Sequence, residues 1–79
     1  MNRHLTLYTR RHCCLCEEMK EVIRKVARAN PIELDEIDVD SSPQLTEAFG
    51  AEVPVLFIDR RKAFKYRVSA GELKKRLER

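Results

Sequence analysis

The sequence predicts an α/β fold whose strands and helices follow the order β-α-β-α-β-β-α. Three observations predict it: a long helical pattern directly after a cluster of cysteines, a continuous apolar run at 54–58, and a helix-start signal near the C-terminus. A chain of 79 residues has room for one modest core. We therefore expect residues 1–79 to form a single domain.

The first third of the chain predicts a strand followed by an amphipathic helix. Leu5 and Leu7 alternate with polar residues across 4–9, which is typical of a strand. Asn30 and Pro31 end the helix that follows, because proline cannot continue the helical hydrogen-bond pattern. One face of this helix carries apolar residues at spacings of three and four: Leu15, Met19, Val22, Ile23, Val26 and Ala27.

The middle of the chain predicts a second strand at 32–39 and a short helix after it. The apolar positions of this strand change phase between Leu34 and Ile37, which indicates a β-bulge. Ser42 directly before a proline is a typical N-cap, because proline fits the first position of a helix. We expect the short helix to end at Gly50.

The last third of the chain predicts two strands and a closing helix. The apolar run at 54–58 is typical of a central strand that is covered on both faces. A polar turn at 59–62 leads to a fourth strand. Apolar residues alternate along that strand: Phe64, Tyr66 and Val68. Ser69 and Glu72 form a capping-box pattern that opens the last helix, whose two leucines face inward.

Composition and charge limit the partners. The longest apolar run, 53–58, has six residues and is too short to span a membrane. The first residues lack the apolar core of a secretory signal, so we expect a cytoplasmic, reducing location and no membrane partner. A net charge of +3 is too small to predict nucleic-acid binding. We expect a monomer.

The three cysteines lie within four positions, so they cannot link distant segments as a stabilising disulfide framework does. Cys13 and Cys16 form a C-x-x-C pair at the start of the predicted helix. As the N-cap, Cys13 can accept hydrogen bonds from the amides of Leu15 and Cys16, which favours its thiolate together with the helix dipole. We therefore predict thiol–disulfide exchange, with Cys13 as the nucleophile and the more buried Cys16 as the resolving thiol. Cys14 is expected to have no role.

The chain resembles the glutaredoxins, and most closely the small bacterial glutaredoxin-like proteins whose active site reads cysteine, any residue, leucine, cysteine and then acidic residues. The resemblance rests on 8–10, on 13–18 and on 53–56 and covers essentially the whole chain. It implies a thioredoxin-like fold, in which helices flank a mixed four-stranded sheet. It also implies that the Val53–Pro54 bond is cis and packs against the active-site sulfurs, with the Val53 backbone pairing with an extended substrate.

Two departures from the glutaredoxin pattern affect the predicted substrate. Cys14 and Leu15 stand where well-studied glutaredoxins usually carry proline and an aromatic residue, and 66–71 lacks their Gly-Gly pair. Glutathione is a candidate reductant, and no tightly bound cofactor is expected. The backbone of glutathione would pair with Val53. One of its carboxylates would be held by the helix start at Ser69 and the other by Arg10 or Arg11. Without the Gly-Gly pair we expect weak glutathione binding. A disulfide-containing protein or a larger thiol is the better substrate, with a reductase as a further partner.

Two other functions are compatible with the sequence. His12 and the three cysteines could share an iron–sulfur cluster between two chains, whereas a single-chain zinc site is disfavoured, because four ligands within five residues can hardly surround one ion. The fold could also serve as a noncatalytic interaction module, whose basic turn at 60–62 and basic last helix bind an acidic protein or RNA. Colour after anaerobic purification tests the first alternative. A cellular role that survives mutation of Cys13 would favour the second.

Overall fold

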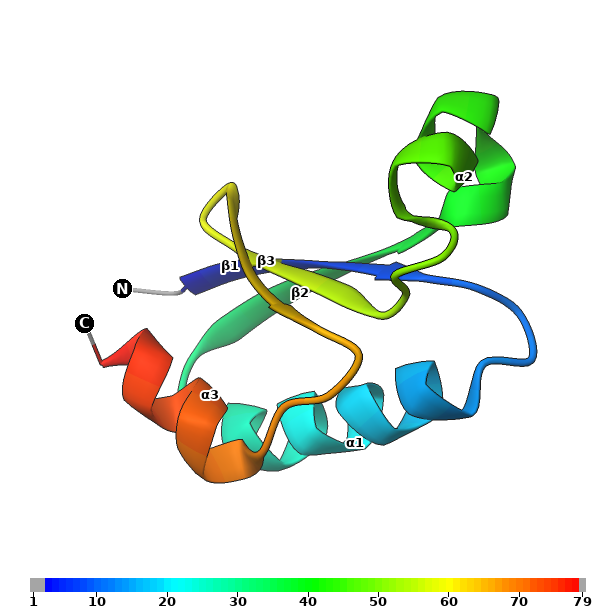
Figure 1. Ribbon diagram of the computed structural model, residues 1–79. Helices are drawn as coiled ribbons and strands as arrows, with labels where there is room; N and C mark the ends of the chain where they lie inside the picture. Colours follow the sequence, from blue (N-terminus) through cyan, green and yellow to red (C-terminus); the bar gives the residue numbers. More distant parts are fainter. Residues whose placement is uncertain (1–2, 79) are drawn as a thin grey trace.

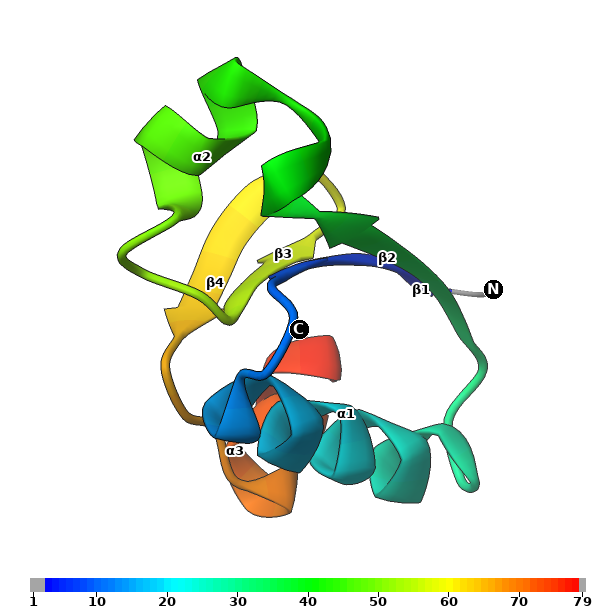
Figure 2. The same ribbon diagram turned by 90° about the vertical axis from the view of Figure 1, so that its right-hand side faces the viewer.

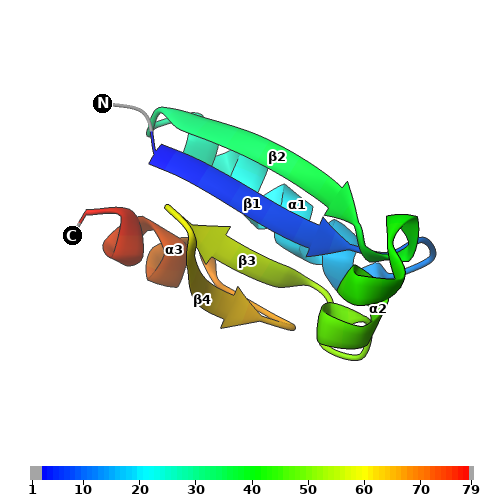
Figure 3. The ribbon, with the colours of Figure 1, turned by 90° about the horizontal axis from the view of Figure 1, so that it is seen from above.

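The computed structural model describes residues 3–78 and confirms the predicted element order. The strands are β1 (Arg3–Thr9), β2 (Ile32–Asp38), β3 (Val55–Ile58) and β4 (Arg61–Lys65). The helices are α1 (Cys14–Ala27), α2 (Pro43–Phe49) and α3 (Ala70–Leu77), with a 3-10 turn, η1 (Val39–Ser41), before α2. The four strands form one mixed sheet in the order β2-β1-β3-β4 (Figure 3). β1 and β2 are parallel, whereas β3 is antiparallel to both of its neighbours.

Helices cover both faces of the sheet. α1 and α3 lie together on one face, and α2 covers one end of the other face (Figure 1). The main core fills the space between the sheet and the α1–α3 pair, and consists of Leu5, Leu7, Met19, Ile23, Val26, Leu56, Ile58, Val68, Leu73 and Leu77. On the opposite face, the ring of Tyr8 stacks on Phe49 of α2 at 4.6 Å between centroids and meets Phe57 edge-on. These two apolar layers hold the C-terminal end of β1 and the N-terminal end of α1, where the cysteines lie.

The predicted bulge in the second strand is wrong. β2 pairs with β1 in an unbroken parallel register over its whole length. The apolar pattern changes phase because the covered face changes. Leu34 packs against the main core on the α1 side, whereas Ile37 pairs with Tyr8, whose ring stacks on α2. The bulge of this sheet lies instead in β4, where Ala63 is left unpaired between Lys62 and Phe64.

The hairpin between β3 and β4 is tighter than predicted. Asp59 and Arg60 both have positive φ, 48° and 73°, as a two-residue hairpin turn requires. Arg61 and Lys62 therefore belong to β4 and not to the turn. The predicted fourth strand is also too long, because β4 ends at Lys65 and Tyr66 adopts a left-handed conformation with φ 67°.

The predicted boundaries of α2 are correct, although its cap works differently. Ser42 is the N-cap, yet its hydroxyl donates to the Gln44 side chain at 2.7 Å and makes no capping hydrogen bond. At the other end, a Cβ on Gly50 would lie 2.5 Å from the carbonyl oxygen of Thr46. Glycine is favoured at this helix end because any side chain would meet that carbonyl oxygen. Its backbone conformation does not require glycine, since a φ of −54° is an ordinary helical value.

Candidate functional site

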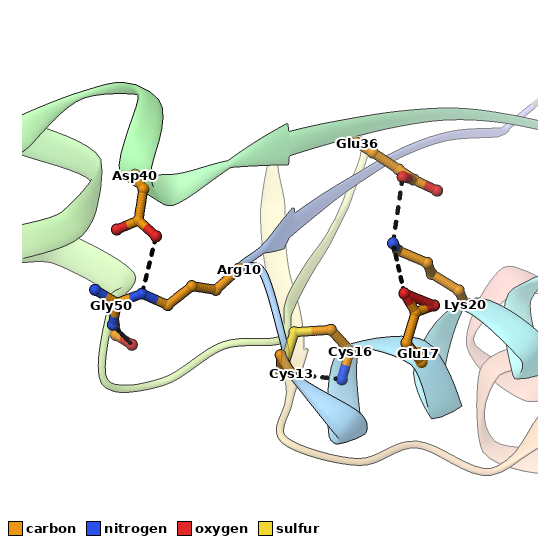
Figure 4. Close-up of a disulfide and its surroundings, with 8 residues drawn as sticks. All are labelled: Arg10, Cys13, Cys16, Glu17, Lys20, Glu36, Asp40 and Gly50. Atoms are coloured by element: carbon orange, nitrogen blue, oxygen red, sulfur yellow. Dashed lines mark hydrogen bonds and ion pairs between the residues drawn. A yellow bond between two sulfur atoms is a disulfide. The ribbon is translucent and has the colours of Figure 1, made fainter.

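Cys13 and Cys16 occupy the first turn of α1. Cys13 is the N-cap, and its sulfur accepts a hydrogen bond from the amide of Cys16 at 3.1 Å. The predicted second bond, from the amide of Leu15, is not formed within residues 3–78. The two cysteines form a disulfide, with their Cα atoms 5.2 Å apart (Figure 4). Cys16 is 1% exposed, Cys13 is half-buried, and Cys14 is an exposed free thiol. The two sulfurs of the pair are therefore unequal in access.

The loop before β3 lies at the same end of the sheet as the cysteines. Tyr8, near the end of β1, pairs with Val55, the first residue of β3, so the segment before β3 runs beside the loop that leads to Cys13. The predicted cis peptide bond between Val53 and Pro54 is confirmed. Pro54 is buried, and neither the amide nor the carbonyl of Val53 makes a backbone hydrogen bond within residues 3–78. Within this part of the chain both groups are therefore without a backbone partner.

The two arginines predicted to bind substrate are placed differently. Arg10 extends toward α2, where its guanidinium donates to the Asp40 carboxylate at 3.1 Å and to the Gly50 carbonyl at 3.2 Å (Figure 4). Arg11 is exposed. Both arginines line a cavity of about 440 Å³ together with His12 of the Cys13 loop. The same cavity is also lined by Lys20 and by the carboxylates of Glu17 and Asp38, and Arg10 reaches it while already bound to Asp40, so its lining does not single out an anionic ligand.

A lysine that sequence reasoning missed balances the acidic residues near the disulfide. Lys20 is 17% exposed and contacts Glu17 at 3.5 Å and Glu36 of β2 at 3.6 Å (Figure 4). The contact with Lys20 partly neutralises the negative charge of Glu17. The Glu17 carboxylate therefore repels a thiolate in the first turn of α1 less strongly. The spacing of three residues between Glu17 and Lys20 on one helix was the available signal.

Ser69 opens α3 with the predicted capping box. Its hydroxyl accepts from the Glu72 amide at 3.1 Å, and its own amide donates to the Glu72 carboxylate at 3.1 Å. The start of this helix therefore already holds a negative charge. A ligand carboxylate that binds there has to approach Glu72, which weakens this part of the predicted glutathione site.

No group of three or more His, Cys, Asp and Glu side chains in residues 3–78 is arranged to hold a metal ion. None of the helices in this part of the chain is both long and apolar enough to cross a membrane.

Comparison with known proteins assigns the family. Residues 4–78 match the model of the glutaredoxin-like domain (DUF836). This chain belongs to the glutaredoxin-like domain family. A glutaredoxin-like protein of Dictyostelium discoideum is 32% identical over 76 residues, which are 89% of this chain and 70% of that protein. A Nitrosomonas europaea protein solved by NMR is 30% identical, with a TM-score of 0.80 over 94% of this chain and 89% of its own.

The predicted fold is confirmed by a more distant structure as well. Thioredoxin-2 of a malaria parasite superposes with a TM-score of 0.70 over 98% of this chain and 82% of its own, at 17% identity. That likeness shows the fold alone. The glutaredoxin-like domain described by residues 3–78 thus combines a thioredoxin-like fold with a closely spaced cysteine pair, which is consistent with a redox role.

Proposed function

We propose that this glutaredoxin-like domain is a thiol–disulfide oxidoreductase that works through Cys13 and Cys16. The observation that carries the proposal is the position of the pair. The two cysteines are bonded to each other at the N-terminus of α1, and the more accessible one is the N-cap, where an amide points at its sulfur. A helix start with such an amide favours a thiolate, which is the reactive form of a thiol.

The proposed reaction begins with the reduced pair. The Cys13 thiolate attacks one sulfur of the substrate disulfide; a Cys13–substrate disulfide forms, and the other substrate sulfur leaves as a thiolate that takes a proton from solvent. Cys16 then loses its proton and attacks the Cys13 sulfur, so the second substrate sulfur leaves as a thiol. The substrate gains two electrons and two protons, and the domain ends as the Cys13–Cys16 disulfide. A thiol reductant restores the dithiol.

A disulfide-containing protein is the proposed substrate. The amide and carbonyl of Val53, which make no backbone hydrogen bond within residues 3–78, can pair with an extended polypeptide as one short piece of added strand. Glutathione can use the same groups, but its carboxylates would meet Glu72 at the start of α3, and Arg10 is already paired with Asp40. These contacts support weak glutathione binding, as the sequence predicts.

The test is a disulfide-reduction assay on three matched variants. Cys13→Ser should abolish exchange, because it removes the attacking sulfur. Cys16→Ser should stop the cycle at the mixed disulfide, which mass spectrometry detects as a trapped complex. Cys14→Ser is the control, since Cys14 is exposed and outside the disulfide. Exchange that survives in Cys13→Ser but is lost in Cys14→Ser would overturn the assigned roles.

The reductant is tested in the same assay with two regenerating systems, glutathione with its reductase and thioredoxin reductase. We propose a reductase partner in the cytoplasm, where thiols are kept reduced. We propose that the domain needs no tightly bound cofactor, because only sulfur atoms exchange bonds in this reaction, and that it works as a monomer, because one chain carries both cysteines. Turnover with glutathione as sole reductant at low micromolar concentration would contradict the weak glutathione binding that we propose.

A further inference from the structure

A cavity of about 500 Å³ lies at the end of the sheet opposite to the cysteines. It is formed where β1 begins, where the β3–β4 hairpin turns and where α3 ends, and Figure 3 shows these three segments together at the end that points away from α2. Its lining residues are Arg3, Ile58, Asp59, Arg61 and Arg76. The three arginines come from three different elements, so the fold gathers positive charge at this end of the sheet.

Asp59 is the acidic residue of this lining, and its charge is already paired. The Asp59 carboxylate accepts hydrogen bonds from the Arg3 side chain at 2.7 Å and from the His4 amide at 3.2 Å. Arg3 also donates to the carbonyl of Leu77 at 2.8 Å, which ties the start of β1 to the end of α3. The Arg3–Asp59 pair therefore adds no net charge to the cavity. The charge that remains is that of the other two arginines.

These two arginines have no acidic partner in the described chain. Neither Arg61 nor Arg76 forms an ion pair with a carboxylate within residues 3–78. The guanidinium carbon of Arg76 lies 5.9 Å from the centroid of the Phe64 ring. This cation–π contact places Arg76 beside β4 without neutralising its charge. Two positive charges are therefore left at one cavity.

The acidic residues around β4 do not cancel this charge. Glu52 accepts from Lys62 at 2.9 Å and from Lys65 at 3.4 Å, so it is paired with the two lysines of the strand. The acidic strand β2 lies at the opposite edge of the sheet from β4 (Figure 2). Three strand spacings of about 4.8 Å separate the two edges by roughly 14 Å, which exceeds the Debye length of ~8 Å at physiological ionic strength.

The charge and size of the cavity indicate the class of ligand. Arginine binds carboxylates and phosphates through two parallel hydrogen bonds. A phosphate monoester carries nearly two negative charges at neutral pH and exposes three acceptor oxygens, so it matches both Arg61 and Arg76. A carboxylate has a single charge and would leave one arginine unmatched. The volume of about 500 Å³ lies within the roughly 300–1,000 Å³ of small-molecule sites, which leaves room for an organic group against the buried Ile58.

We propose that this cavity binds a small phosphorylated molecule, whose phosphate group is held by Arg61 and Arg76. The Arg3–Asp59 pair holds the start of β1, the hairpin and the end of α3 in place around the ligand. The site lies at the opposite end of the sheet from Cys13, so it can be filled while a disulfide substrate is bound. The proposal does not depend on the oxidoreductase function and gives the domain a second ligand.

The test is an NMR titration of the isotope-labelled chain with glucose phosphate. Free glucose is the control for the organic group, and sodium acetate at equal ionic strength is the control for a carboxylate. Glucose phosphate should cause saturable shifts of the amides of Asp59, Arg61 and Arg76, and neither control should do so. Saturable shifts of these amides with an acidic peptide or a single-stranded RNA, but none with glucose phosphate, would overturn the proposal.

Matched variants separate the two guanidinium groups from general positive charge. Arg61→Gln and Arg76→Gln should each raise the dissociation constant for glucose phosphate by about 10-fold or more, because each loses a hydrogen bond to a charged group. Arg61→Lys keeps the charge without the two parallel donors and should also weaken binding. Lys62→Gln removes the same charge from the next residue of β4, which is paired with Glu52, and should change the constant by less than about 2-fold. Equal weakening by Lys62→Gln and Arg61→Gln would refute the site.

Thermal unfolding gives a second readout that is independent of the thiol chemistry. Glucose phosphate should raise the Tm of the wild-type chain, because a ligand that binds only the folded state stabilises it. It should not raise the Tm of the double variant Arg61→Gln/Arg76→Gln, whose circular dichroism without ligand should match the wild type because both side chains are exposed. Cys13→Ser should bind glucose phosphate as the wild type does. An equal rise of Tm in the wild type and the double variant would show that the ligand binds elsewhere and that the proposal is wrong.

Discussion

The negative charge at the start of α3 should limit the affinity for glutathione, and Glu72→Gln tests this directly. Glu72 holds the Ser69 amide at 3.1 Å, at the end of the helix where a ligand carboxylate would bind. Glutamine can fill the same capping position, so the variant removes the charge and keeps a cap. A charge in the first turn of an exposed helix is worth ~0.3–1 kcal/mol, so the dissociation constant for glutathione should fall by about 2- to 5-fold. The same variant should be less stable than the wild type, because the folded chain loses the favourable interaction of ~0.3–1 kcal/mol between the Glu72 charge and the helix start. This loss lowers Tm by about 1–8 °C.

The assay is calorimetry or NMR titration with glutathione in a Cys16→Ser background, together with thermal unfolding. Glu78→Gln is the matched control, because it changes the net charge equally at the other end of α3. Ser69→Ala is a second control, since it removes a side-chain cap worth ~1 kcal/mol and leaves the Glu72 charge in place. If Glu78→Gln raises the affinity as much as Glu72→Gln, long-range charge and not the helix start sets the affinity. Unchanged affinity in Glu72→Gln would refute glutathione binding at this helix.

Two further predictions concern stability. Gly50→Ala should lower the free energy of unfolding in urea by ~1–3 kcal/mol, because the added Cβ would lie 2.5 Å from the Thr46 carbonyl oxygen. The control Gly71→Ala should raise it by ~0.5–1 kcal/mol, because a Cβ at this position of α3 meets nothing within 4 Å. An equal effect of the two changes would contradict the reasoning. The hydrogen bond from Lys62 to Glu52, assisted by Lys65, lowers the pKa of Glu52 below its ordinary value of 4.5. A carboxyl with a lowered pKa stabilises the fold above its ordinary pKa, and this contribution is lost as the pH falls through the folded-state value. Glu52→Gln should therefore reduce the loss of Tm between pH 7 and pH 3, and an unchanged difference in Tm between these two pH values would show that the pair does not matter.

Elements with strong periodicity were predictable from the sequence, because their signals are local. The apolar face of α1, the capping box of Ser69 and Glu72, and the buried run of β3 each depend on residues a few positions apart. The change of phase in β2 could not be interpreted in this way. It depends on which helix covers which face of an edge strand, and that is set by the tertiary fold.

The position of the cysteine pair in the candidate site was predictable from the sequence, whereas the surroundings of the pair were less so. The N-cap position of Cys13 follows from the start of the helical pattern, and the structure places it there. The partner of Arg10 was not predictable, because Asp40 lies thirty residues away and meets it only through the fold. The sequence predicts Tyr66 as part of an alternating strand, because no local signal indicates a left-handed conformation for this aromatic residue.

The strand directions explain why three separate loops meet at one end of the sheet. α1 begins after the carboxyl end of β1, so the cysteines lie beyond that end. β3 runs antiparallel to β1, which brings the segment before its first residue, with Val53 and Pro54, to the same end. β4 is antiparallel to β3 and therefore parallel to β1, so its carboxyl end carries Tyr66 to this end as well. The hydrogen bond from Tyr66 to Pro54 joins the last two loops. The proposed thiol chemistry at Cys13 and the proposed backbone pairing at Val53 would therefore take place at one end of the sheet.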